Sequence, residues 1–105
     1  MKRYFVYVTF ENEAQAEKVA ESVVEKRLAA CANIFSPHKS VYWWDGKVEK
    51  ATEYAAVFKT TEDALSSLKD HITEQHSYDV PCVVALPIET GNPEFLKWIG
   101  DEVKV

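Results

Sequence analysis

An Asp-Gly pair between two long apolar segments constrains the fold of this 105-residue chain more than any other feature. The segment VYWWDGKVEK, residues 41–50, places a run of aromatic residues directly before Asp45 and Gly46. A type I′ turn needs positive φ at both central residues, and Asp-Gly is a favoured pair for it. The sequence therefore predicts a long β-hairpin, with arms over residues 31–44 and 47–60.

The two tryptophans at the end of this hairpin raise a packing problem. Neighbouring residues on a strand point to opposite faces, so Trp43 and Trp44 cannot both face one core. At about 3.3 Å per residue, each arm could reach roughly 45 Å, whereas a domain of this size is only about 33 Å across. We therefore expect the hairpin to extend beyond its own domain, where another subunit covers the second tryptophan. The alternative is that one tryptophan lies flat on the surface of its own subunit.

The rest of the chain predicts an α+β fold. Apolar alternation and helical spacing follow the order strand, helix, strand, strand, helix, strand, with a short last helix that begins at Pro93. We expect Asn12 to cap the first helix, with Gln15 at the capping-box position, and Thr60 or Thr61 to cap the second. This order is the split βαβ pattern of a ferredoxin-like βαββαβ sandwich. Right-handed connections place both main helices on one face of the sheet.

The other face of the predicted sheet has no cover within one chain. Residues 2–10 are apolar on both faces of their strand, and strands of this kind are normally buried on both sides. This is a second reason to expect an oligomer.

Composition fits one soluble domain over residues 1–105 and excludes several classes of function. Hydrophobic residues make up 47% of the chain, charged residues make up 28%, and the formal net charge is -5. A nucleic-acid or membrane-surface protein would favour a basic face, so we expect neither partner. We find no signal peptide pattern and no apolar stretch near the roughly 20 residues of a membrane span. Two distant cysteines are too few for a disulfide scaffold, which favours a reducing cytoplasm.

One short segment collects metal-binding side chains. His76, Asp79 and Cys82 lie within seven residues, on a loop that leads into a strand. Imidazole and thiolate together suit zinc or copper, and Asp79 could ligate the ion or orient the imidazole. The alternative is purely structural: Asp79 caps a turn, Cys82 packs as a small apolar residue, and His76 ends a helix.

Cys31 is a second candidate, although a free cysteine at the start of a strand is more often a packing residue. The predicted sheet places Cys31 and Cys82 at opposite edges, so we expect no disulfide between them. Glu49 and Glu53 share one face of the hairpin, where they could form ion pairs between subunits or face solvent.

Taken together, these residues resemble the CutA family of divalent-cation tolerance proteins. The matching segments span essentially the whole chain, in order: EKRLAACANI (25–34), YWWDGKVEK (42–50), FKTTED (58–63), YDVPCVVALPIETGN (78–92) and FLKW (95–98). The resemblance implies a ferredoxin-like fold assembled as a homotrimer, similar in architecture to the PII signalling proteins. It also implies a link to tolerance of copper and other divalent metals.

The loop departs from the family's usual His-Pro-Tyr-Glu-Val-Pro-Glu. Ser77 replaces the first proline, Asp79 shortens the acidic arm, and Cys82 replaces the last carboxylate. A thiol makes any site here softer and better suited to Cu(I) or Zn. The resemblance also places a family cysteine at Cys31, which adds it to the candidate ligands.

Our leading hypothesis is a non-enzymatic, cytoplasmic homotrimer that binds a copper or zinc ion and needs no cofactor. Its candidate metal ligands are His76, Cys82, Asp79 and Cys31.

Two other hypotheses belong to different classes. The first is a PII-like signalling module that binds a small ligand in clefts between subunits and docks on an unidentified protein partner. Its candidate cleft residues are Lys59, Tyr78, Trp43 and Trp44. The second is a hydrolase or oxidoreductase that uses one of the two cysteines, which would need a lowered thiol pKa beside a base.

Overall fold

The predicted α+β fold and the predicted order of elements are confirmed in the computed structural model, which describes residues 2–105. The elements are β1 (Arg3–Phe10), α1 (Glu13–Glu25), β2 (Cys31–Ile34), β3 (His38–Trp44), β4 (Lys47–Thr61), α2 (Leu65–Gln75), β5 (Val83–Pro87) and α3 (Pro93–Glu102).

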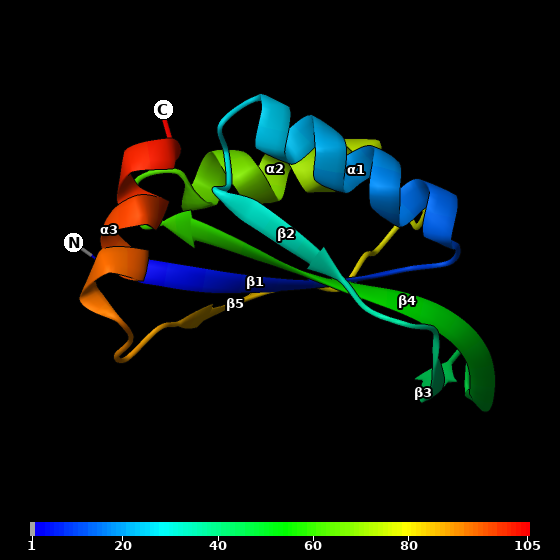
Figure 1. The fold of residues 1–105 in the computed structure, drawn as a ribbon. Helices are drawn as coiled ribbons and strands as arrows, with labels where there is room; N and C mark the ends of the chain where they lie inside the picture. The colour runs from blue at the N-terminus through cyan, green and yellow to red at the C-terminus, as the bar shows by residue number, and fades with distance from the viewer. Residues whose placement is uncertain (1) are drawn as a thin grey trace.

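The sheet is antiparallel, in the order β2-β4-β1-β5, and β3 pairs with the far part of β4. Helices α1 and α2 cover one face, as predicted, and α3 packs at the end of the sheet where β1 begins (Figure 1). The face away from α1 and α2 is open along the middle of the sheet (Figure 1). β2 and β5 lie at opposite edges, so the strands at Cys31 and Cys82 are separated as expected.

The main core fills the space between the sheet and the two helices. Alternate residues of β1, namely Val6, Val8 and Phe10, point into it and are fully buried. Other strands and helices contribute Ala56, Phe58, Ala16, Val19, Ala20, Val23, Leu68 and Ile72.

Apolar side chains on the open face remain exposed. Phe5 of β1 is 38% exposed, and Val84 and Leu86 of β5 are 49% and 58% exposed. Because strands alternate their side chains, these residues are the other half of the two-sided apolar pattern in the sequence. The chain thus presents a sheet surface that a single copy does not bury.

The hairpin extends beyond the domain body, and its far end curves away from the helices (Figure 1). Its turn has φ of 50° at Asp45 and 76° at Gly46, as the predicted turn requires. The longest dimension of the chain is 44 Å. Trp43 is 74% exposed and Trp44 is 61% exposed, so neither tryptophan packs into the core of its own chain.

Of the two predicted helix caps, one is confirmed. The Asn12 side chain accepts a hydrogen bond from the Gln15 backbone N–H at 2.8 Å and caps α1. The Gln15 side chain instead contacts Ser77 Oγ at 2.9 Å and the Gln75 carbonyl oxygen at 3.4 Å. It therefore joins the start of α1 to the end of α2.

The cap predicted for the second helix is wrong. Thr60 and Thr61 belong to β4, because the pairing of β1 with β4 continues to Arg3 and Thr61. Helix α2 is preceded by a turn, and its N-cap residue, Ala64, has no side chain that could cap it. Thr61 Oγ1 accepts a hydrogen bond from the Ala64 N–H at 3.4 Å, so the threonine holds the turn rather than the helix.

Within residues 2–105, no helix is long and apolar enough to cross a membrane.

Candidate functional site

His76 fixes the start of the loop that follows α2. Its Nε2 donates a hydrogen bond to the Thr9 carbonyl oxygen at 2.7 Å, and its Nδ1 accepts one from the Tyr78 backbone N–H at 3.1 Å. The partners define a neutral ring with its proton on Nε2. The ring also stacks on Phe10, with centroids 4.9 Å apart and planes 9° from parallel. Both ring nitrogens are engaged, so metal binding by His76 would require one of these hydrogen bonds to break.

Tyr78 joins the same loop to β4. Its hydroxyl donates a hydrogen bond to Glu53 Oε2 at 2.8 Å. Burial of the phenol and then this bond to a carboxylate raise the pKa of Tyr78 above its ordinary value. Glu53 therefore belongs to the site, although the sequence placed it only in an ion pair or in solvent. The contact spans 25 positions in sequence, and no local pattern signals it.

A groove of about 540 Å³ lies between this loop and the hairpin. Its lining residues are Thr9, Ser40, Tyr42, Trp44, Glu53, Tyr78, Asp79, Val80 and Cys82. The structure thus brings together four of the predicted site residues, Trp44, Tyr78, Asp79 and Cys82. A volume of this size is within the range of about 300–1,000 Å³ typical of small-molecule sites.

Cys82 lines the groove and lies just before β5. Partial desolvation and then the negative charge of Glu53 raise the pKa of its thiol. The thiol is therefore held protonated, which is opposite to the activation that a nucleophilic cysteine needs. A metal ion that binds here would have to displace the proton.

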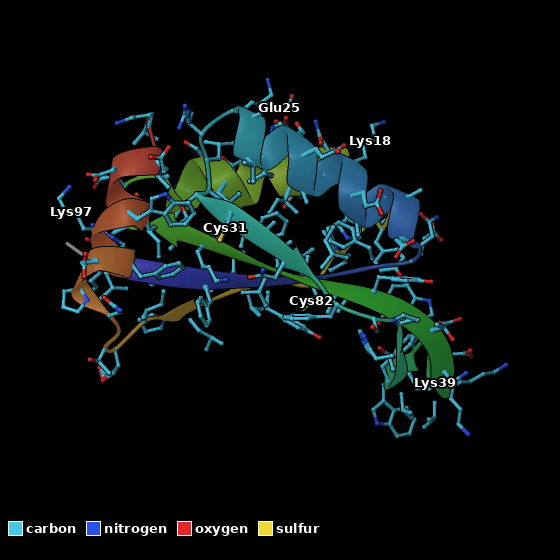
Figure 2. All side chains as sticks on the ribbon, in the orientation of Figure 1. Lys18, Glu25, Cys31, Lys39, Cys82 and Lys97 are labelled. Atoms are coloured by element: carbon cyan, nitrogen blue, oxygen red, sulfur yellow. The ribbon has the colours of Figure 1, made fainter. Side chains whose placement is uncertain are left out.

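The remaining predicted residues lie elsewhere in the chain. Cys31 begins β2 at the opposite edge of the sheet from Cys82 (Figure 2). Lys59 hydrogen-bonds Asn33, and its Nζ lies 5.8 Å and 6.0 Å from the ring centroids of Phe5 and Phe95.

Trp43 does not line the groove, because it points to the other face of the hairpin from Trp44. One chain therefore does not assemble the cleft that the sequence suggested from Lys59, Tyr78 and both tryptophans.

A preformed metal site is also absent from the described part of the chain. In residues 2–105, no three His, Cys, Asp or Glu side chains are grouped so that they could hold an ion. Asp79, Cys82 and Glu53 nevertheless line one groove and offer two carboxylates and a thiol. Further ligands would have to come from water or from another subunit.

Comparison with known proteins identifies a family over almost the whole chain. Residues 4–102 match the family described as CutA1 divalent ion tolerance protein. A protein from Archaeoglobus fulgidus called divalent-cation tolerance protein CutA is 46% identical over 100 residues, which cover 95% of this chain and 97% of that protein.

Solved structures agree with the sequence matches. The structure of a protein called the periplasmic divalent cation tolerance protein CutA, from Archaeoglobus fulgidus, superposes with a TM-score of 0.94 at 45% identity and covers 97% of this chain and 99% of that chain. The crystal structure of CutA1 from Oryza sativa superposes with a TM-score of 0.96 at 40% identity and covers 99% of this chain and 95% of that chain.

Proposed function

This chain belongs to the CutA1 divalent ion tolerance family, and from that premise we propose that it contributes to divalent cation tolerance by binding the metal ion itself. The observation that carries this proposal is the groove between the loop and the hairpin, which a thiol and two carboxylates line without a basic residue among them. Carboxylate oxygens and thiolates are metal ligands, and the thiol adds a preference for Cu(I) or Zn.

The proposed ligands differ from the set that the sequence alone suggested. Cys82 and Asp79 keep their roles, and Glu53 joins them from β4. His76 is held by its own hydrogen bonds and shapes the loop instead. Because the pKa of Cys82 is raised, binding must release a proton, and affinity should increase with pH.

The proposed assembly is the homotrimer that the family resemblance implies. Its support in this chain is the uncovered apolar sheet face, including Phe5, Val84 and Leu86, together with the exposed Trp43 on the hairpin. Large exposed apolar patches of this kind mark interfaces between proteins. Sedimentation equilibrium tests it: wild type should sediment as a trimer, and Leu86→Glu should shift it towards monomer.

We further propose that the protein is a non-enzymatic, cytoplasmic binding protein without a nucleic-acid or membrane partner. The raised pKa of Cys82 supports a non-enzymatic role, and two free cysteines support a cytoplasmic location. The net charge of -5 supports the lack of a nucleic-acid or membrane partner. Cell fractionation tests the location directly, since one structural relative is called periplasmic.

A PII-like signalling role with an unidentified protein partner is the second candidate function. The aromatic walls and the volume of the groove favour it, because both suit a small organic ligand. A thermal-shift screen of metals against nucleotides and small anions separates the two functions.

The decisive test of metal binding is competition of the reduced protein against a chromophoric chelator for Cu(I) and Zn(II). We expect Cys82→Ser to weaken binding at least about tenfold, equivalent to about 1.4 kcal/mol, and Asp79→Asn and Glu53→Gln to weaken it less. Cys31→Ser is the matched control and should bind as wild type does. Equal weak binding by all of these proteins would overturn the proposal, as would loss of binding in Cys31→Ser alone.

A further inference from the structure

The two faces of the hairpin present different residues. Strand β3 alternates, so Ser40, Tyr42 and Trp44 line the groove while its other residues point away from it. The register places Glu49 opposite Tyr42 on the groove face. The neighbouring pair, Val41 and Lys50, lies on the reverse face.

The groove itself is aromatic and acidic. Its lining includes three aromatic residues, Tyr42, Trp44 and Tyr78, and two acidic residues, Glu53 and Asp79. No lysine or arginine is among the residues that line it.

Lys47, the cross-strand partner of Trp44, lies at the hairpin tip outside the lining. Across residues 2–105, neither of the ion pairs between side chains involves Glu53 or Asp79. The groove therefore has negative charge that the chain does not neutralise with an ion pair.

One aromatic wall is fixed in place before any ligand arrives. The Tyr78 ring packs against the His76 ring, with centroids 4.9 Å apart, and its hydroxyl is bonded to Glu53. A wall that is already ordered loses less conformational freedom on binding, which favours affinity.

We propose that this groove binds a small organic cation, an alkylammonium group on a short apolar stem. Aromatic faces attract cations through their quadrupole, and carboxylates add direct charge attraction. An anion would meet Glu53 and Asp79 without a basic residue to compensate. The proposal shares Glu53 and Asp79 with the proposed metal site but does not rest on metal binding, because the aromatic rings that attract a cation are not among the proposed metal ligands.

The test is isothermal titration of the reduced, metal-free protein with choline, in the presence of a chelator. The comparison ligand is 3,3-dimethyl-1-butanol, which has the same shape as choline but carries carbon in place of the charged nitrogen. We expect choline to bind at least about tenfold more tightly than this neutral isostere. Absence of choline binding, or equal binding of the two ligands, would overturn the proposal. Because metal is excluded, the result is independent of whether metal binding is confirmed.

Adjacent tryptophans provide a matched pair of variants. Trp44→Ala should weaken choline binding about fivefold, the loss expected for one cation–π contact, whereas Trp43→Ala should leave it unchanged. Both side chains are exposed in a single chain, so neither change removes core packing. Because Trp43 also supports the proposed trimer, sedimentation of both variants checks that the assembly is unchanged. Glu53→Gln should also weaken choline binding, because it removes charge while keeping an acceptor for Tyr78. Equal effects of the two tryptophan variants, or no effect of Glu53→Gln, would show that the groove is not the binding site.

Discussion

Replacing His76 by phenylalanine separates a structural role from a metal-ligand role. The ring bridges the Thr9 carbonyl oxygen and the Tyr78 N–H, at 2.7 Å and 3.1 Å, and stacks on Phe10. Phenylalanine keeps an aromatic ring for the stack but removes both hydrogen bonds. Each bond contributes about 1 kcal/mol net, so we expect His76→Phe to lower the free energy of unfolding by roughly 2 kcal/mol. His76→Ala also loses the aromatic contact, which contributes about 0.5–1.5 kcal/mol, and should lose roughly 3 kcal/mol in total.

Urea denaturation of the three proteins measures these differences at one fixed protomer concentration, since assembly would otherwise shift apparent stability. Metal affinity is then measured on the folded proteins. We expect His76→Phe to retain the Cu(I) and Zn(II) affinity of wild type within about twofold. The reasoning is refuted if His76→Phe is as stable as wild type, because the two hydrogen bonds would then contribute nothing. It is also refuted if the folded variant loses metal affinity at least about tenfold, because His76 would then be a ligand.

Three further outcomes follow from the site and the helix cap. Alkylation of Cys82 should be slow at neutral pH and accelerate only above the ordinary thiol pKa of about 8.5. Glu53→Gln removes one cause of the raised pKa of Cys82 and should increase the alkylation rate at fixed pH. Because folding raises the pKa of Tyr78, the phenol contributes fully to stability below about pH 10, and this contribution is lost as pH increases further. In thermal denaturation at increasing pH, Tyr78→Phe should not show this decrease in stability. Asn12→Ala removes the α1 cap and should cost about 1 kcal/mol in chemical denaturation, whereas an unchanged midpoint would show that the cap contributes no stability.

Local signals in the sequence predicted the elements well, because their causes are local. The Asp45-Gly46 turn and the Asn12 cap each depend on a few adjacent residues, and both are confirmed. Two-sided apolar strands likewise indicated the uncovered sheet face. The second helix start failed for a non-local reason: pairing with β1 extends β4 through Thr61, beyond the point where a threonine alone suggests a cap.

The candidate site was predicted only in part, since its contacts join distant segments. The loop around Asp79 and Cys82 was identified because its metal-binding side chains are close in sequence. Glu53 was not, because its role depends on how β4 lies beside the loop. Lys59 does not line this groove within one chain, and its place in a cleft between subunits stays a prediction. Residue type alone does not tell which end of a long strand meets the loop.

The most direct test of this account is an amide chemical-shift titration of the isotope-labelled, reduced protein with Zn(II). The account predicts that shifts concentrate in residues 78–82, on the groove side of the hairpin and at Glu53, with saturation on addition of metal. Shifts centred on Cys31, or none above those of a chelated control, would contradict the claim that the groove between loop and hairpin is the functional site.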